Sequence, residues 1–470
     1  MRTDPFQHNS EEGGCRILMR FLCWRRENIS DTAFLFIVAT LTGLLAGTGA
    51  FVLKHLVAAV SHFMTAGLRP MSGNPELLLI PVAGIVLTGI FCRYVLRMHL
   101  AHGVRQLMAD LSRKVYRLRA ALTVTPILAS TITLGFGGSA GSEGPIAYAG
   151  AAIGSNMGRL CRFSPRMMMI IVGCGAAAGI AGIFKSPLGG ALFTLEVLRM
   201  PLSTVSVLVL LVGAVTASMT AYALSGCSLD IPFDQSLAFD PSLLPFIVLL
   251  GIFCGIYSLY YSYIMKSVGN WLGHLSNPWI KNLAGGIMLA VLIFLFPVLY
   301  GEGYETIGRV INGDFSTLLG DSIFAGRGGA WTLILFSGGA LVVKCFATSA
   351  TNNGGGVSGD FAPTLFAGCM AGFFFASLLN ELFGLDLPPA HFAYFAMAGV
   401  MAGAIRAPLM AIFLTCEMGA AYAFFLPLML TAAISFGIVR LVTADSYFSH
   451  RQDRHNGLVS RIKRVFHNNS

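Results

Sequence analysis

Two glycine-rich stretches of this chain share one pattern, and each ends at a proline that precedes an apolar segment. The first covers residues 137–145 (GGSAGSEGP) and the second covers residues 355–363 (GGVSGDFAP). At an offset of 218, positions 137, 138, 141, 145, 149, 150 and 154 meet identical residues in the second copy. Since proline fits the first turn of a helix, each stretch predicts a loop followed by a helix N-terminus. Free N–H groups at such an end bind anions without a full positive charge.

The repeat extends beyond the loops. Residues Ala177–Val197 and Ala398–Met418 match at an offset of 221, including the pair Glu196 and Glu417. Two matched blocks at nearly equal offsets argue against chance similarity between glycine-rich and alanine-rich helices. We therefore predict two related halves, approximately residues 75–225 and 285–442. Interrupted hydrophobic segments at corresponding places of two halves point to a binding site at the repeat interface.

The composition places the chain in a membrane. It is 55% hydrophobic and 11% charged, whereas soluble proteins carry roughly 25% charged residues. The net charge of +9 comes from short basic clusters beside apolar spans, at residues 16–26, 113–119 and 451–464. That distribution predicts an inner-membrane protein with both termini in the cytoplasm and no nucleic-acid partner. We expect a polar tail at 1–32, a transmembrane domain at 33–448 and a basic tail at 449–470.

The hydrophobic pattern predicts an all-α, multi-pass protein with broken helices. Between residues 120 and 198 the apolar pieces are short and are separated by glycine and proline. Helices that stop inside the membrane are tolerated where they line a cavity or are covered by protein. The other apolar segments are residues 32–68, 77–96, 205–224, 243–265, 283–300, 331–375, 392–418 and 424–442.

Glu143 is the acidic residue inside the first glycine-rich stretch. A carboxylate within a long apolar segment is costly and usually functional. We expect Glu143 to compete with an anion for the same backbone N–H groups; the alternative is a glutamate in a solvent-facing loop. Its counterpart in the second copy is Phe361, so the halves differ at this position.

Further acidic residues lie near the same regions. Asp360 precedes Phe361, and we expect its side chain to point away from the anion as a helix cap while its backbone N–H contributes to the site. Glu196 and Glu417 occupy equivalent places in the repeat. Their symmetry favours a structural role, such as bonding to neighbouring backbone, over catalysis.

Enzyme, metal and cofactor chemistry find no support in the sequence. The ten cysteines are scattered, without a CxxC pair or a His/Cys cluster at metal-ligand spacing. An intramembrane enzyme using Glu143 with Glu196 or Asp360 would need a nucleophile or metal ligands, and neither HExxH nor a cluster of histidines is present. We expect no catalytic residue, no metal site and no cofactor. A non-transporting receptor or scaffold would leave Glu143 unexplained.

These motifs together resemble the CLC family of chloride channels and chloride/proton antiporters, over about residues 33–450. Residues 141–145 (GSEGP) are similar to the family's GREGP motif, with Ser142 in place of arginine, and residues 359–363 (GDFAP) match GxFxP. Residues 101–105 (AHGVR) resemble a divergent GSGIP. Tyr447 matches the tyrosine that closes the inner end of the family's anion pathway.

The resemblance implies a homodimer in which each subunit has its own pathway and an inverted-topology repeat of about eighteen helices. Glu143 would be the proton-linked gating glutamate that alternates between blocking the anion site and moving aside. The implied anion-binding residues are His102, Gly103, Val104, Ser142, Gly144, Pro145, Gly359, Asp360, Phe361 and Tyr447.

Three departures from the family pattern affect the predicted function. His102 replaces a serine ligand, so a backbone N–H or a protonated imidazole would take its place. Val197 stands where the antiporters carry a glutamate that receives protons from the cytoplasm, and Glu196 would face about 100° away. The tail after Tyr447 is too short for paired CBS domains, which fits a prokaryotic type.

We therefore expect transport of chloride, and of small anions such as nitrate or bromide, by a channel or weakly coupled carrier. A stoichiometric chloride/proton antiporter with a non-standard proton path is the alternative. The loop sequences lack the altered motifs of the family's fluoride-specific branch.

Overall fold

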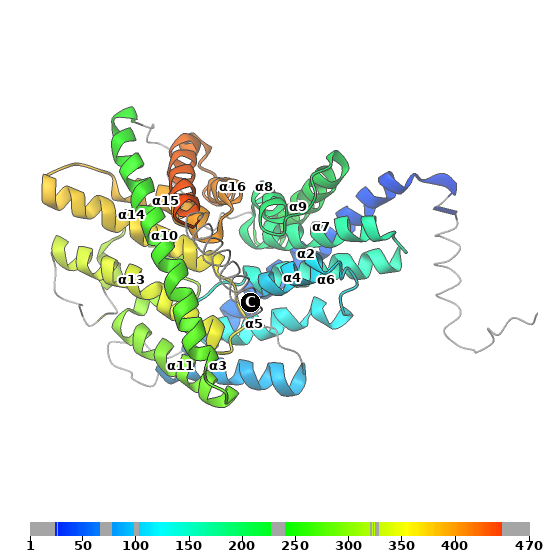
Figure 1. Ribbon diagram of the computed structural model, residues 1–470, viewed down its shortest axis with the longest axis horizontal. Helices are drawn as coiled ribbons and strands as arrows, with labels where there is room; N and C mark the ends of the chain where they lie inside the picture. The colour runs from blue at the N-terminus through cyan, green and yellow to red at the C-terminus, as the bar shows by residue number, and fades with distance from the viewer. Residues whose placement is uncertain are drawn as a thin grey trace, which may run out of the picture.

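The computed structural model describes residues 24–25, 27–65, 78–97, 103–226, 240–319, 322, 324 and 329–443. Across these ranges the chain is helical, and its one β-type feature is an isolated antiparallel bridge between Gly141 and Gly359. Figure 1 shows α2 and α4–α9 on one side of the molecule and α10, α11 and α13–α16 on the other, with α3 beside α11.

The helices confirm the all-α membrane class, because eight of the described ones are long and apolar enough to cross a membrane. The α-helices are α2 (Asp31–Thr65), α3 (Leu79–Ile90), α4 (Gly103–Ser112), α5 (Thr125–Gly135), α6 (Glu143–Leu160), α7 (Pro165–Phe184), α8 (Pro187–Glu196), α9 (Thr204–Leu224), α10 (Leu244–Gly273), α11 (Pro278–Leu295), α12 (Tyr304–Ile311), α13 (Ala330–Gly354), α14 (Phe361–Phe383), α15 (Pro389–Ile405) and α16 (Pro408–Met418). A last apolar stretch covers Tyr422–Thr443.

Several predicted segments differ in their bounds from the observed helices, and two of these differences have a local cause. The segment predicted at 283–300 is α11, which begins earlier, at Pro278, and ends before Pro297. This follows because proline starts helices readily and disfavours a helical residue before it. The segment predicted at 392–418 is broken into α15 and α16, since Arg406 adopts a left-handed conformation with φ of 63°.

The two halves repeat the same order of helices. α6 and α14 begin 218 residues apart, and α8 and α16 begin 221 residues apart, as the sequence repeat predicts. The breaks also correspond, because Lys185 after α7 and Arg406 after α15 both have positive φ, 52° and 63°. The repeat is therefore a repeat of supersecondary structure.

The glycines shared by the halves allow helices to cross in close contact. A Cβ on Gly150 of α6 would overlap the carbonyl oxygen of Gly175 of α7, and one on Gly368 of α14 would lie 2.5 Å from the Ala396 carbonyl oxygen of α15. Gly150 and Gly368 are equivalent positions of the repeat. Because lipid gives helices little hydrophobic reason to associate, such small-residue contacts hold membrane helices together.

Glu196 at the end of α8 binds the start of α16, and Glu417 at the end of α16 binds the start of α8. The Glu196 carboxylate at the end of α8 accepts from the N–H groups of Leu409 (3.2 Å) and Met410 (2.8 Å) at the start of α16. The Glu417 carboxylate accepts from Leu188 (3.0 Å) and Gly189 (3.1 Å) at the start of α8. The predicted bonding to backbone is confirmed, and it links the two halves by capping otherwise unpaired N–H groups.

Replacing Glu417 by Ala is expected to lower the stability of the fold by about 1–3 kcal/mol. The two N–H groups of α8 and the Ser186 hydroxyl, which donates to Oε2 at 2.5 Å, lose a charged acceptor in a half-buried place. Thermal unfolding of purified protein in detergent measures the change. Glu381→Ala, at an exposed position of α14, is the control, and an equal loss in both variants would contradict this role.

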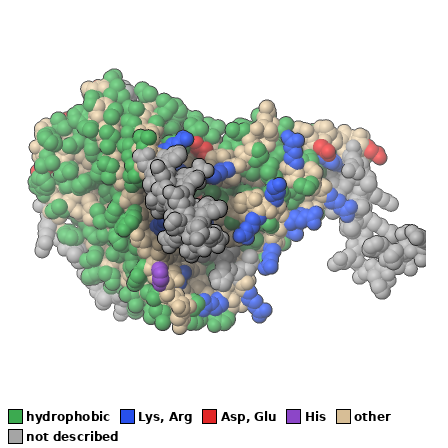
Figure 2. Space-filling model, viewed as in Figure 1, with side chains coloured by type: hydrophobic (Ala, Val, Ile, Leu, Met, Phe, Trp, Pro, Cys, Tyr) green, Lys and Arg blue, Asp and Glu red, His purple; other side chains and the backbone are tan. Residues whose placement is uncertain are grey.

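The exterior of the helical body is apolar. Figure 2 shows hydrophobic side chains over most of the side where α10, α11 and α13 lie, and Lys and Arg gathered toward the other side. Large apolar side chains are exposed on these helices, among them Ile256 (59%), Val291 (53%) and Leu335 (71%). Such a surface requires lipid or another apolar surface around it.

Candidate functional site: a buried carboxylate between two helix N-termini

The two glycine-rich loops pair with each other at the centre of the repeat. The Gly141 N–H donates to the Gly359 carbonyl oxygen at 3.0 Å, and the Gly359 N–H donates to the Gly141 carbonyl oxygen at 2.6 Å. These glycines are equivalent positions of the two halves. The antiparallel pairing fits an inverted repeat and brings the N-termini of α6 and α14 together.

Equivalent threonines brace the two loops crosswise. Thr133 of α5 accepts a hydrogen bond from the Val357 N–H of the second loop at 3.0 Å. Its repeat partner, Thr351 of α13, accepts from the Ser139 N–H of the first loop at 3.1 Å. Each half therefore fixes the loop of the other, which gives the glycine-rich backbone one conformation.

Glu143 is the first residue of α6, and its side chain is bound at the N-terminus of α14. Oε1 accepts from the N–H groups of Phe361 and Ala362, the second at 3.0 Å. The residue is fully buried. Among the described residues, Oε2 has no hydrogen-bond partner. The Glu143 carboxylate therefore lies at the helix N-terminus where a bound anion is predicted.

The carboxylate fits only because the residues beside it lack side chains. A Cβ on Gly359 would lie 2.7 Å from Oε1 of Glu143 and 2.8 Å from the Gly144 nitrogen, and one on Gly141 would overlap the carboxylate. Gly144 in turn is close to the Ser358 carbonyl oxygen, which a Cβ would meet at 3.0 Å. The glycines that define the motif therefore shape a space for a small anionic group.

A third helix N-terminus lies against this position. Gly103, the first residue of α4, is buried, and its Cβ would be 2.6 Å from the carbonyl oxygen of Gly144. Val104 follows and is partly buried, and Ser142 and Pro145 are buried at the start of α6. Of the residues predicted to bind an anion, those of α4, α6 and α14 are brought together. His102 and Tyr447 lie outside the described residues.

The Asp360 side chain points away from the site as predicted, but it does not form the predicted helix cap. Its side chain points away from Glu143, since Oδ1 accepts from Asn352 Nδ2 at 2.5 Å and Oδ2 lies 3.8 Å from Arg105 Nη2. It makes no side-chain cap bond to α14. The amides that hold the Glu143 carboxylate belong to Phe361 and Ala362, and the Asp360 N–H is not among its donors.

Lys344 of α13 is a charged residue that the sequence analysis missed. It is fully buried, its Nζ donates to Ser139 Oγ at 2.9 Å, and it lies 4.6 Å from the centre of the Phe366 ring. Among the described residues it forms no ion pair; the carboxylates that act on it electrostatically are Glu143 and Glu302. A lysine inside an apolar helix is as costly as a glutamate there, so Lys344 is expected to be functional for the same reason as Glu143.

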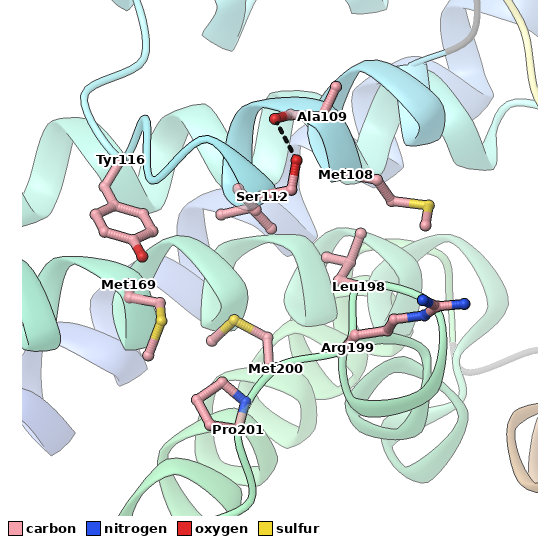
Figure 3. A pocket seen from close by; sticks show the side chains of 10 residues that line it. Met108, Ala109, Ser112, Tyr116, Met169, Leu198, Arg199, Met200 and Pro201 are labelled. Carbon is pink, nitrogen blue, oxygen red and sulfur yellow. Dashed lines mark hydrogen bonds between the residues drawn. The ribbon is translucent and has the colours of Figure 1, made fainter. Parts of the chain in front are cut away.

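A separate cavity of about 360 Å³ lies at the other end of α4. Figure 3 shows Met108 and Ser112 of α4 facing Met169 of α7 and the segment Leu198–Pro201. The lining is mostly apolar, and none of the predicted anion-binding residues belongs to it. Val197, at the C-cap of α8, is half-buried and immediately precedes this segment.

The fold and the site define a class of helical membrane protein. Its two related halves bring the N-termini of interrupted helices together around one buried carboxylate. A family model described as "Voltage gated chloride channel" matches residues 84–440. The chain belongs to this family, and the resemblance found in the sequence is confirmed.

A relative named as a chloride channel and one named as an exchange transporter have the same sequence identity to this chain. It is 28% identical over 394 residues to the "Putative chloride channel protein ClcB-like" of Ralstonia nicotianae, covering 82% of this chain and 87% of that protein. It is 28% identical over 325 residues to the "H(+)/Cl(-) exchange transporter ClcA" of Vibrio cholerae, covering 67% and 66%.

A solved structure has the same fold. The structure of "a slow cyanobacterial Cl-/H+ antiporter" superposes with a TM-score of 0.74 at 24% identity, covering 87% of this chain and 94% of that one.

Proposed function

We propose that the chain transports chloride through a pathway that Glu143 opens and closes. The observation that carries this proposal is the buried Glu143 carboxylate bound to two backbone N–H groups at the N-terminus of α14. A site that holds a carboxylate oxygen with N–H donors and no metal-type ligand set also suits a monovalent anion. Such donors bind an ion weakly enough to release it, as transport requires.

Protonation of Glu143 is the opening step. A protonated carboxyl has no charge, so its bonds to Phe361 and Ala362 weaken and the side chain leaves the amides. A chloride ion then takes the vacated donors, with the nearby charge of Lys344 favouring an anion there. When the proton is lost, the carboxylate returns and displaces the ion. The implied ligands His102 and Tyr447 complete the pathway in this proposal.

We favour a channel or a weakly coupled carrier over a stoichiometric exchanger. Val197 carries no proton, and the carboxylate of the adjacent Glu196 is bound to α16. A relative named as a channel and one named as an exchanger are equally identical to this chain, so the alternative exchanger would use another proton path. The distribution of Lys and Arg supports cytoplasmic termini in an inner membrane, and the resemblance to the family supports a homodimer.

Flux measured in chloride-loaded liposomes tests the proposal. Chloride efflux and external pH are followed together after reconstitution of the full chain. We expect chloride efflux with little proton movement. Proton uptake against its gradient, driven by chloride, would favour the exchanger, and a lack of chloride flux at every pH would contradict the proposed function.

A further inference from the structure

A second carboxylate is bound at the same site, on the other helix. Glu302 Oε1 accepts from the N–H of Ser142 at 2.9 Å. Ser142 is the N-cap residue of α6, it is 2% exposed, and its own side chain makes no cap bond. The two helix N-termini that meet here therefore each hold a carboxylate, Glu143 on α14 and Glu302 on α6.

The backbone around Glu302 fixes it between the first loop and α14. Its neighbours Gly301 and Gly303 have φ of 68° and 88°, a conformation that favours glycine. The Gly301 N–H donates to the Gly137 carbonyl oxygen at 3.4 Å, and a Cβ on Gly303 would lie 2.6 Å from the Phe366 ring. This turn is in contact with both parts of the site.

The charged groups around Glu302 come from two further elements. Glu143 of α6 and Lys344 of α13 each interact with it electrostatically. α14 contributes the apolar ring of Phe366, and Tyr300, Tyr304 and Glu305 are the nearest titratable residues on the same segment. Two carboxylates that interact electrostatically exchange protons with water as a pair, so each influences the charge of the other.

We propose that Glu302 is a second gating residue, and that an anion enters the site when both Glu143 and Glu302 are protonated. This inference rests on the function proposed above. Protonation of Glu143 frees the N–H groups of α14, and protonation of Glu302 frees the N–H of Ser142 on α6. An ionised Glu302 keeps that donor occupied and places a negative charge beside the pathway.

The pH dependence of chloride flux in liposomes tests this role, with Glu302→Gln compared to Glu305→Gln. Glu305 follows three residues later in α12, where it is exposed and pairs with Arg309 at 2.5 Å. In the pH range where both carboxylates are ionised, wild-type flux should rise about 100-fold for each unit that the pH falls, and this steepness should be about tenfold per unit in Glu302→Gln. Glu305→Gln should behave as the wild type does.

Equal steepness in Glu302→Gln and wild type would overturn the proposal. A structural cap alone would lower the unfolding temperature of the variant and leave the steepness unchanged. Should the variant fail to fold, calorimetry of chloride binding to the wild type in buffers of different ionisation enthalpy counts the protons taken up, and about two are expected; uptake of one would also overturn it. A wild type without chloride flux would contradict the proposed function instead.

Discussion

Replacing Glu143 by Gln is expected to raise chloride flux about tenfold at neutral pH and to reduce the steepness of its pH dependence from two protons to one. The neutral amide oxygen accepts more weakly from the N–H groups of Phe361 and Ala362 than a carboxylate does, and a difference of about 1.4 kcal/mol corresponds to a factor of ten. The remaining dependence on pH would come from Glu302. Flux from liposomes at several pH values measures both effects.

The matched control for this variant is Glu381→Gln, which changes an exposed glutamate at the far end of α14. It should keep the rate and the pH profile of the wild type. Any proton movement coupled to chloride should vanish in Glu143→Gln and persist in the control. A Glu143→Gln protein with wild-type rate and pH profile would show that the buried carboxylate is not the gate.

Replacing Lys344 by Met is expected to weaken chloride binding about tenfold, or about 1.4 kcal/mol. The substitution removes a buried amine that binds Ser139 of the first loop and that, when protonated, interacts electrostatically with Glu143 and Glu302. A charge within about 10 Å of an ion contributes about 1–2 kcal/mol at the effective dielectric constant of proteins. Since Met is similar in size to Lys and brings no charge into this buried place, the fold should be retained.

Chloride titration by calorimetry, in the Glu143→Gln background, isolates the effect of Lys344 from competition with the carboxylate. Lys266→Met is the control, because Lys266 is an exposed lysine of α10. It should leave the affinity unchanged. An affinity within twofold of the parent in Lys344→Met would contradict an electrostatic role for Lys344 in anion binding.

The sequence predicts the positions of helix starts better than the contacts between helices. Proline and glycine act on the backbone locally, so the starts of α6, α8, α14 and α16 are confirmed within a few residues. The bond between Thr133 and Val357 joins residues far apart in the chain. No local pattern predicts such a pairing, although the sequence repeat does show that Thr133 and Thr351 are equivalent positions.

The candidate site was predicted in part because its main signal is local. Glu143 stands out as an acid in an apolar stretch, whereas Glu302 lies in a short polar turn and shows no such contrast. Lys344 does show the contrast and could have been found by the same rule. The break at Arg406 was also signalled, because its repeat partner Lys185 precedes the proline that begins α8.

In the proposed mechanism, the Glu143 carboxylate and a transported anion compete for the N–H groups of Phe361 and Ala362. Anomalous diffraction from Glu143→Gln crystals soaked in bromide tests it most directly, since bromide replaces chloride and is located without ambiguity. We expect a bromide peak within hydrogen-bonding distance of these two nitrogens in the variant, and a weaker or missing peak there in the wild type at high pH. Bromide elsewhere along the pathway, with none at the start of α14 in the variant, would contradict it.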